Sequence, residues 1–475
     1  MRTALVWFRD DLRLRDHPAL QAALQSGFAP IPVYVHAPHE EGAWAPGAAS
    51  NAWRHRALHA LDARLRARGS RLHVFAGDSG DTLQRLAVAT QAAAVFWNRR
   101  HEPAAEQRDG AVRRRLRALG LRAEARASGL LFEPWQLETR NGEPFRAFTP
   151  FWNAARRHWN PPVLSPAPAR LPGFDPLPGE TAIDALGLQP ARGWDSGFWQ
   201  RWTPGEDGAT RALEAFVGHG LQDYADGRDR PAQRLTSRLS PHLHFGEITA
   251  ARILAGLADA GPGTGREAFV RELAWREFAW HVLHHFPHTS EADFNPRFAG
   301  FPWARPDPGL LDAWQRGRTG IPLVDAGMRE LWATGWMHNR VRMVAASLLV
   351  KHLRMHWLHG ARWFWDTLVD ADLGNNTLGW QWVAGTGVDA APWFRVFNPV
   401  LQAQRFDPQG DYIARWVPEL RALAPRARHA PWMAAAGERA RIGRGYPARP
   451  VVDPAEGRAA ALAAFEQTRT GTAGR

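Results

Sequence analysis

The stretch WMHNRVRM, at residues 336–343, mixes indole, imidazole, amide and guanidinium groups at helical spacing. The chain from there to Pro399 adds more aromatic, acidic and amide side chains: Trp357, Asp370, Asp372, Asn375, Asn376, Trp380 and Trp382. A helix that only fills a core carries Leu, Ile and Val every 3.6 residues and keeps its charges for solvent. Here polar groups and indoles alternate too closely for all the polar groups to reach water. We expect them to pair with one another or with a polar, planar ligand.

The length and composition of the chain limit its class. It has 475 residues, enough for two or three domains, and no cysteine, which excludes disulfides, cysteine-ligated metal sites and thiol catalysis. The first ten residues are charged where a signal peptide needs an apolar block, and no run approaches eighteen apolar residues. We expect a soluble, cytoplasmic protein.

The net charge of +12 has two interpretations, and both stay open at this point. A basic chain favours a polyanionic partner such as nucleic acid. However, Lys351 is the only lysine, and the Ala-, Arg-, Gly- and Pro-rich composition is also what codon bias in a G+C-rich genome produces. The 24 tryptophans are more unusual, since packing alone seldom needs so many.

The first 130 residues alternate short apolar runs with helical patterns. We expect strands at residues 4–8, 31–36, 71–75, 93–97 and 121–125, and helices after Pro18 and at residues 52–68, 81–90 and 104–119. This alternation predicts βαβ units in a doubly wound, Rossmann-like parallel sheet of five strands. No G-x-G-x-x-G follows the first strand, so any chemistry here is expected at the carboxyl ends of the strands.

Composition divides the rest of the chain. Residues 159–180 are rich in Pro, Ala and Gly, which is typical of a linker that wraps a surface. From about Gly205 onward the patterns are almost wholly helical. We therefore expect an α/β domain at residues 1–130, an interdomain linker at 131–204 and an all-α domain at 205–475.

Three clusters in the all-α part carry chemical possibilities. Hydroxyls in the stretch TSRLS, residues 236–240, precede Pro241 and an expected helix at 246–257, which suits either an anion site or simple helix capping. Glu272, Trp275 and Arg276 fall three and four positions apart, so a helix places them on one face. The histidines are less promising, because no nearby carboxylate completes a zinc set; they are His281, His284, His285 and His288.

Five motifs together resemble the photolyase/cryptochrome family. They are WFRDDLR at 7–13, TSRLS at 236–240, WREF at 275–278, WMHNR at 336–340 and GWQW at 379–382, and they span most of the chain in the family's order. Within the family the chain is most similar to bacterial photolyases that act on cyclobutane pyrimidine dimers (CPDs). The resemblance implies an N-terminal α/β antenna domain and an α-helical domain that binds one FAD non-covalently.

The resemblance also implies which residues hold FAD. By position, the phosphates and ribityl chain would contact Tyr224, Thr236, Ser237, Arg238, Leu239 and Ser240. Arg342 would pair with Asp370 beside the isoalloxazine ring, near Asp372, and Asn376 would face flavin N5. A neutral amide there stabilises the reduced, anionic flavin. Further positions that match cofactor contacts are Phe269, Arg276 and Asn339.

Three of the tryptophans match the family's electron-hopping triad. Trp380, Trp357 and Trp303 would carry an electron from the surface to the photoexcited flavin. Indoles suit this role because they are oxidised and reduced again without leaving their packed positions.

The lesion pocket implied by the resemblance is that of a CPD enzyme. It comprises Glu272, Trp275, Asn339, Met343 and Trp382, and the related (6-4) enzymes have His at the positions of Asn339 and Met343. The two indoles would stack on a flipped-out dimer, while Glu272 would hydrogen-bond its carbonyl region or protonate it. Three more positions match DNA contacts: Arg228, Arg340 and Gln402.

The chain departs from the family pattern at a few positions. Trp393 and Phe269 replace other aromatic residues, and Ala105 replaces an Asn that precedes the folate-contacting acid, here Glu106. The antenna chromophore therefore stays open between methenyltetrahydrofolate, a deazaflavin, another flavin and none.

The expected function is light-driven repair of CPDs in DNA, in which reduced FAD gives an electron to the dimer and recovers it after the ring opens. This is a light-dependent carbon–carbon lyase reaction. The alternative is a cryptochrome-type blue-light photoreceptor whose FAD is photoreduced through the tryptophan chain, and a third class is a light-independent nucleic-acid-binding protein. We expect a monomer that needs dimer-containing DNA, no metal and no protein partner.

Overall fold

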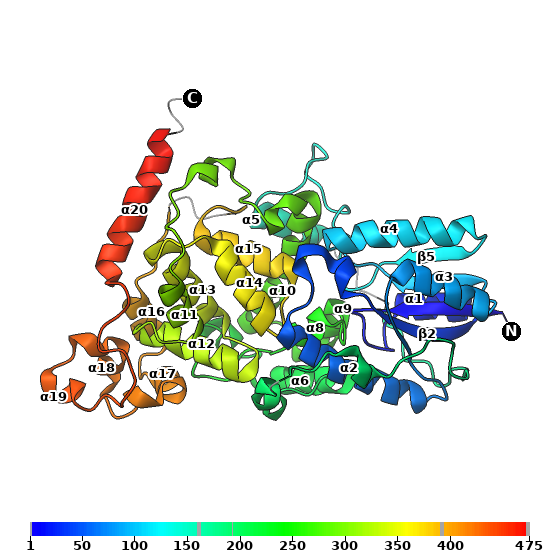
Figure 1. Cartoon of the computed structure of the whole chain (residues 1–475), viewed down its shortest axis with the longest axis horizontal. Coiled ribbons are helices and arrows are strands. Elements are labelled where there is room, and N and C mark those ends of the chain that lie inside the picture. The colour runs from blue at the N-terminus through cyan, green and yellow to red at the C-terminus, as the bar shows by residue number, and fades with distance from the viewer. Residues whose placement is uncertain (1, 159–162, 192, 390–393, 472–475) are drawn as a thin grey trace.

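The computed structural model describes residues 2–158, 163–191, 193–389 and 394–471 (Figure 1). Trp159, Pro161 and Pro162 of the expected linker lie outside the described residues, as does Trp393. The α/β region forms one end of an elongated molecule and the helices that follow Gly205 form the other end (Figure 1).

The N-terminal region contains a five-stranded, fully parallel sheet in the order β3-β2-β1-β4-β5. Its strands are β1 Thr3–Phe8, β2 Ala29–His36, β3 His73–Ala76, β4 Ala94–Asn98 and β5 Arg122–Arg126. β1 lies in the centre, where the chain changes direction, and pairs Trp7 with Val33 on one side and with Trp97 on the other. The five expected strands and the doubly wound order are confirmed.

Helices cover both faces of this sheet because β1 is apolar on both faces. Ala4, Val6 and Phe8 pack with α1 (Pro18–Gln25) and α2 (Ala48–Arg66). Leu5 and Trp7 pack with α3 (Ser79–Ala89) and α4 (Pro103–Ala118) on the opposite face. Successive side chains of a strand point to opposite faces, so an uninterrupted apolar run is buried on both sides.

The region beyond Gly205 is helical, as expected. Its α-helices are α6 Glu206–His219, α7 Tyr224–Gly227, α8 Ser240–His244, α9 Ala250–Gly256, α10 Thr264–His285, α11 Pro308–Gln315, α12 Pro322–Thr334, α13 Asn339–Ser347, α14 Trp357–Thr367, α15 Leu373–Ala384, α16 Pro399–Phe406, α17 Asp411–Trp416, α18 Pro425–His429, α19 Ala436–Arg439 and α20 Pro454–Gly471. A π-helical turn, Leu348–His352, follows α13.

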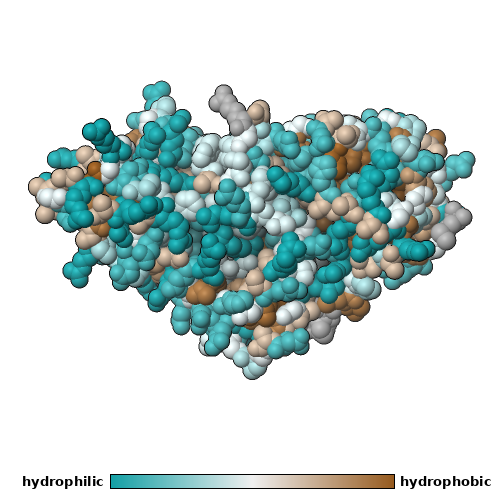
Figure 2. Space-filling model, turned by 90° about the horizontal axis from the view of Figure 1, so that it is seen from below, coloured by the Kyte–Doolittle hydropathy of each residue, from teal (hydrophilic) through white to brown (hydrophobic). Residues whose placement is uncertain are grey.

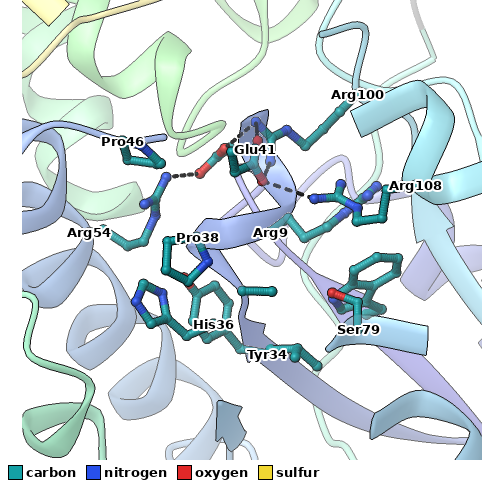
Figure 3. A pocket seen from close by; sticks show the side chains of 14 residues that line it. Arg9, Tyr34, His36, Pro38, Glu41, Pro46, Arg54, Ser79, Arg100 and Arg108 are labelled. Atoms are coloured by element: carbon teal, nitrogen blue, oxygen red, sulfur yellow. Dashed lines mark hydrogen bonds and ion pairs between the residues drawn. The ribbon is translucent and has the colours of Figure 1, made fainter. Parts of the chain in front are cut away.

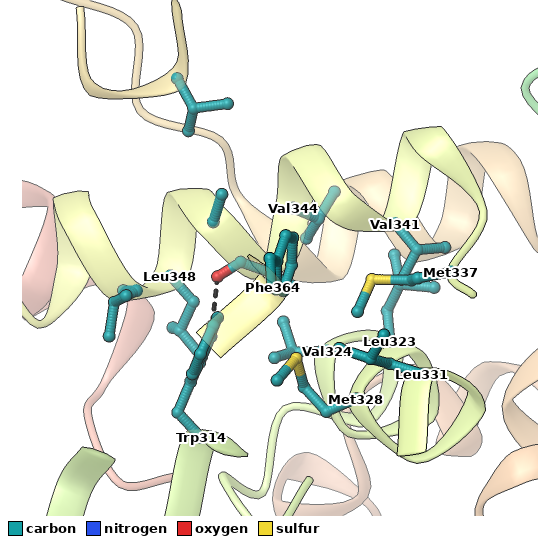
Figure 4. Packing of buried hydrophobic residues seen from close by; sticks show 14 of the residues in the cluster. Trp314, Leu323, Val324, Met328, Leu331, Met337, Val341, Val344, Leu348 and Phe364 are labelled. Carbon is teal, nitrogen blue, oxygen red and sulfur yellow. Dashed lines mark hydrogen bonds between the residues drawn. The ribbon is translucent and has the colours of Figure 1, made fainter. Parts of the chain in front are cut away.

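The helical region is built around one large apolar cluster (Figure 4). Trp314 of α11 is completely buried among side chains of α12, α13 and α14, and its indole N–H donates to the Ala345 carbonyl at 2.9 Å. Met328 and Val341 belong to the same cluster (Figure 4). This core fixes the helices that carry the segment 336–384.

The region expected to be a linker includes a packed helix. α5 (Phe148–Arg157) buries Phe148 and Phe151 against Phe278 of α10. Farther along, Leu171 N–H donates to the Arg68 carbonyl at 2.8 Å and Thr181 N–H to the Val74 carbonyl at 2.8 Å, so the described part after residue 162 runs along the α/β region.

The α/β region and the helices meet along a bonded seam. Leu12 N–H donates to the Phe245 carbonyl at 3.0 Å, Arg13 Nη1 donates to the Gly246 carbonyl at 2.8 Å, and Trp53 Nε1 donates to Glu247 at 2.9 Å. The expected helix at 246–257 is wrong at its start. Gly246 has φ +58°, and a Cβ there would lie 2.4 Å from the Asp10 carbonyl oxygen, so this close approach interrupts the helix and α9 begins only at Ala250.

The surface is dominated by polar side chains. Figure 2 shows a face on which hydrophilic residues predominate, with small hydrophobic patches scattered among them. Among the described residues, none of the helices combines the length and the apolar character needed to span a bilayer.

Candidate active site

A cavity of about 410 Å³ opens between α10, α13, α14 and α15. This volume is in the range of ligand pockets. The sequence-predicted residues that line it are Arg228, Glu272, Trp275, Asn339, Arg340, Arg342, Met343, Asp370, Asp372, Asn376, Trp380 and Trp382. Residues that are far apart in the chain therefore meet at one cavity.

One wall of the cavity is an Arg–Asp pair. Arg342 Nη2 lies 3.0 and 2.9 Å from the two oxygens of Asp370, and Arg342 Nε donates to the Met337 carbonyl at 2.7 Å. Ser240 Oγ donates to Asp370 Oδ2 at 2.6 Å, which connects the start of α8 to this wall. Because the buried Asp370 carboxylate has a charged and a neutral donor, its charge is compensated.

A second wall is the start of α15. Asp372 caps this helix, because its Oδ1 accepts from the backbone N–H and from Nδ2 of Asn375, each at 2.8 Å. Its Oδ2 accepts from Trp280 Nε1 at 3.2 Å. One turn on, Asn376 Nδ2 donates to the Ala361 carbonyl at 3.1 Å, which leaves the amide oxygen of Asn376 to accept from a ligand N–H.

The cavity is also lined by the carboxylate of Glu272 and by the indoles of Trp275 and Trp382. Glu272 forms an ion pair with Arg228, and Trp275 stacks on Phe148 with ring centroids 3.7 Å apart and planes 7° apart. Phe148 belongs to α5, inside the expected linker, and sequence reasoning missed it because nothing in its local pattern distinguishes it from a core residue. The stack holds the Trp275 ring in one plane.

Arg340 is held at the same opening by a partner that the sequence analysis also missed. Its Nη2 lies 2.7 Å from Asp229 Oδ2, and its guanidinium lies over the Phe406 ring at 4.4 Å. Asp229 follows Arg228 directly, and this alternation of charges was the available signal. Gln402 of α16 does not line the cavity.

The three predicted electron carriers lie in or against the large core. Trp380 and Trp357 are buried, Trp303 is half-buried, and Trp357 Nε1 donates to Asp293 at 2.9 Å. The His356 ring contacts both Trp303 and Trp357, with ring centroids 5.1 and 5.5 Å apart, respectively. Of the three, Trp380 alone lines the cavity.

Several predicted cofactor residues lie away from the cavity lining. Tyr224 and Phe269 pack edge to face at 5.2 Å beside buried Leu239. Arg238 adopts φ +53° and places its guanidinium 4.7 Å from the Trp336 ring. Thr236 and Ser237 also do not line the cavity, whereas Ser240 of this stretch donates a hydrogen bond to Asp370 in the cavity wall.

The predicted common face of Glu272, Trp275 and Arg276 is wrong for Arg276. Its Nη1 donates to the Gly129 carbonyl at 3.0 Å and lies 3.1 Å from Glu277, on the side of α10 that meets the α/β region. The partner of Glu272 is Arg228 instead. A three-residue step keeps Trp275 on the cavity side, whereas the Gly129 carbonyl and the Glu277 carboxylate attract the long arginine side chain away.

The histidines of α10 serve packing contacts. His281 Nε2 accepts from Phe145 N–H at 2.9 Å, while its Nδ1 lies 2.9 Å from the Pro134 carbonyl. Burial lowers the pKa of His281 to about 4, so the ring is neutral. His284 Nδ1 lies 3.0 Å from Glu106 Oε1, which ties the expected folate-contacting acid to α10.

The carboxyl ends of β1 and β2 carry a separate, charged site (Figure 3). Glu41 accepts from Arg100 at 2.7 Å and from Arg108 at 2.9 Å, and Arg54 pairs with Asp10 at 3.0 Å. These groups nearly fill the space, which has a volume of about 30 Å³. A larger cavity of about 210 Å³ lies beside it and reaches Trp44, His244 and Leu373, so it touches both regions of the chain.

Comparison with known families matches both regions. A family described as "DNA photolyase" matches residues 4–171, and one described as "FAD binding domain of DNA photolyase" matches residues 269–467. The deoxyribodipyrimidine photo-lyase of Agrobacterium fabrum is 42% identical over 98% of this chain and 98% of its own.

The chain is also similar to a solved photolyase structure and to a cryptochrome. A bacterial class III photolyase from Agrobacterium tumefaciens superimposes with a TM-score of 0.94 at 42% identity, over 99% of this chain and 98% of the other. Cryptochrome-1 of Arabidopsis thaliana is 37% identical over 91% of this chain and 65% of its own length.

Proposed function

The chain belongs to the photolyase/cryptochrome family, and we propose that it uses light to repair cyclobutane pyrimidine dimers in DNA. The observation that carries the proposal is the composition of the 410 Å³ cavity. The Arg342–Asp370 pair and Asn376 line it together with Glu272, Trp275 and Trp382. A cofactor and a flat substrate held there would share one space.

The chemistry of the cavity fits FAD. The Asn376 amide oxygen is left to accept from a ring N–H, the Arg342–Asp370 pair offers both a cation and an anion, and Phe364 and Trp380 supply apolar walls. Asn339, Arg342, Asp370, Asp372 and Asn376 would hold the group. FAD, when bound in its reduced form and excited by light, supplies one electron to the dimer and takes it back.

The opening of the cavity suits a flipped-out pyrimidine dimer. Trp275 is already held flat by Phe148, so stacking a base on its free face costs little side-chain entropy. Glu272 is paired with Arg228. A lesion carbonyl would compete with Glu272 for the N–H donors of Arg228, or would accept from a donor that Glu272 does not use. A damaged pair stacks poorly, which lowers the cost of flipping it out.

The tryptophans supply a route for restoring the reduced cofactor. Trp380 lines the cavity, Trp357 is buried in the core and Trp303 is half-buried, and the His356 ring contacts both Trp357 and Trp303. Their packed, largely apolar surroundings keep the geometry fixed while charge moves. We propose this order of carriers: Trp303, Trp357 and then Trp380.

The finer assignments belong to the same proposal. We propose an antenna domain at 1–130, a linker at 131–204 and a catalytic domain at 205–475. We also propose a cytoplasmic monomer that acts on dimer-containing DNA without a protein partner. Arg228 and Arg340, which line the cavity, would contact the DNA strand. Gln402 would contact it as well, because Gln402 belongs to α16, the helix whose Phe406 lies under the Arg340 guanidinium.

Repair is tested by incubating the purified, reduced protein with dimer-containing DNA in light and in darkness. We expect light-dependent loss of dimers, reduced at least tenfold in Trp275→Ala. Arg316→Ala, at an exposed residue just after the end of α11, serves as the matched surface control and should repair normally. Absence of light-dependent repair by the wild-type protein would exclude the proposal.

The similarity to cryptochrome-1 favours a photoreceptor as the second candidate. A photoreceptor would show photoreduction of FAD without loss of dimers in the same assay. A colourless preparation would instead indicate a protein that binds no flavin, and an absorption spectrum distinguishes these cases.

A further inference from the structure

Two histidines and an aspartate that do not line the 410 Å³ cavity converge beside α2. His55 and His59 lie one turn apart on α2, and Asp184 lies on a 3₁₀ turn, Ile183–Leu186. The Nε2 atoms of both histidines approach the same oxygen, Asp184 Oδ1, at 2.8 and 2.9 Å. The three donor atoms thus form one compact group.

We propose that this group is a binding site for a divalent first-row metal ion, with Zn²⁺ as the best fit. Histidine pairs spaced i and i+4 on a helix and one carboxylate are an established zinc ligand set. Metal–ligand bonds of about 2.0–2.1 Å in a tetrahedron place the donor atoms about 3.3 Å apart. The two histidine–aspartate separations, 2.8 and 2.9 Å, would therefore each lengthen by only a few tenths of an ångström on coordination.

The surroundings allow this movement and support the ligands. The Asp184 side chain is 73% exposed and that of His59 is 47% exposed, so both can shift, whereas His55 is held in the helix interface at 10% exposure. The Gln189 amide nitrogen lies 3.2 Å from Nδ1 and 3.3 Å from Nε2 of His55. With its oxygen turned to Nδ1, Gln189 would accept the Nδ1–H of a metal-bound ring and fix its orientation.

A second group of possible ligands, His39, Glu40 and Asp78, is less suitable. Glu40 already accepts from the backbone N–H and the hydroxyl of Ser79, at 2.7 and 2.6 Å. Asp78 caps α3 by accepting from Asp81 N–H at 2.7 Å. Both carboxylates are committed to the start of α3, and a metal ion would have to displace these bonds.

A metal ion at His55, His59 and Asp184 would join α2 to the segment that follows the proline-rich part of the chain. The segment around Asp184 otherwise rests on α2 through apolar contacts such as Ile183. Ligands that are brought together only in the folded state make metal binding stabilise that state. The site would act as a clip for this segment, independently of light and of FAD.

Zn²⁺ alone serves as the probe, titrated into the full-length, FAD-loaded protein against a chromogenic chelator. We expect one tightly bound Zn²⁺ per chain in the wild type and in His39→Ala, and at least tenfold weaker binding in His59→Ala and Asp184→Ala. Zn²⁺ should also raise the melting temperature of the wild type and of His39→Ala, but not of the other two variants. Circular dichroism checks that these exposed substitutions leave the fold intact.

Several results would overturn the site. They are no stoichiometric Zn²⁺ binding by the wild type, equal affinity in His59→Ala and the wild type, or a loss of binding in His39→Ala alone. Any of these would mean that Asp184 only bridges two imidazoles by hydrogen bonds.

Discussion

Glu272 and Glu277 lie on the same helix, α10, but have different surroundings. Glu272 is partly exposed at the cavity and pairs with Arg228. Glu277 is buried, and it accepts from Leu131 N–H at 2.7 Å and Phe132 N–H at 3.3 Å. Burial raises the pKa of Glu277 to about 7, despite the nearby Arg276 and these backbone donors. Glu272 lines the cavity, where a substrate can reach it, and Glu277 links α10 to the 131–132 segment.

Glu277 predicts a pH dependence of stability. Between pH 4.5 and about 7 the folded state keeps a proton on this carboxyl that the unfolded state has lost, so its contribution to the unfolding free energy falls as pH rises. The slope is at most about 1.4 kcal/mol per pH unit. Glu277→Gln should remove this component, which denaturant unfolding of both proteins at pH 5 and 7.5 measures.

The comparison between the two proteins isolates Glu277. Asp325, whose burial raises its pKa to about 6, contributes with the same sign in both and cancels. An unfolding free energy with the same pH slope in Glu277→Gln as in the wild type would contradict the assignment.

Replacement of Trp380 should slow the photoreduction of FAD. Because Trp380 is the proposed carrier at the cavity, Trp380→Phe should slow light-driven reduction of oxidised, bound FAD at least tenfold, while protein reduced chemically beforehand should still repair. Trp314→Phe is the matched control, since Trp314 is also buried and its ring lies 6.2 Å from Trp380. Transient absorption measures the rate, and equal loss in both variants would argue against a specific route.

At the scale of elements, α14 and α15 approach each other closely where Gly360 faces the Trp380 indole. A Cβ on Gly360 would lie 2.0 Å from the Trp380 ring, so the helices can pack at this distance only without a side chain there. The same contact holds Trp380 against the cavity. The absence of a side chain at Gly360 therefore determines both how closely the two helices pack and where the ring of the proposed carrier, Trp380, lies.

Gly360→Ala should therefore be destabilising. We expect a loss of about 2 kcal/mol in unfolding free energy from overpacking, with weaker FAD retention because α15 must shift. Gly110→Ala, in the middle of α4 with its nearest neighbour an ordinary 3.6 Å away, should instead gain about 0.5–1 kcal/mol. Chemical denaturation checks both, and a stable Gly360→Ala would show that α14 and α15 can move apart freely.

Local patterns predicted the elements better than their contacts. Alternation with helices located all five strands. The inner strands β1 and β4 are almost wholly apolar because both of their faces are buried, whereas the edge strand β5 is RAEAR and is only partly buried. The cavity residues of α13 and α15 also followed from their polar and aromatic mixture. The stack of Phe148 on Trp275 and the turn of Arg276 toward Gly129 could not be predicted, because each depends on a partner more than a hundred residues away in sequence.

At the scale of the whole molecule, the positive charge predicts salt-dependent DNA binding. If Arg340 contacts a phosphate, Arg340→Gln should lower the magnitude of the slope of log affinity against log salt by about 0.9. Arg316→Gln, whose guanidinium pairs with Asp312 on exposed α11, should leave the slope unchanged. Fluorescence anisotropy with dimer-containing DNA at several salt concentrations measures both, and equal slopes for the wild type and Arg340→Gln would exclude this contact.

The hydrogen-bonded seam at Leu12, Arg13 and Trp53 has an optical consequence. Excitation energy passes between two dyes at a rate that depends on the angle between their transition dipoles as well as on distance. Because the two halves of the molecule are joined by hydrogen bonds to two backbone carbonyls and to the Glu247 carboxylate, rotation of one half against the other cannot average that angle. Any pigment held in the N-terminal half would have its coupling to the flavin fixed by the fold, and polarised spectroscopy would report one orientation.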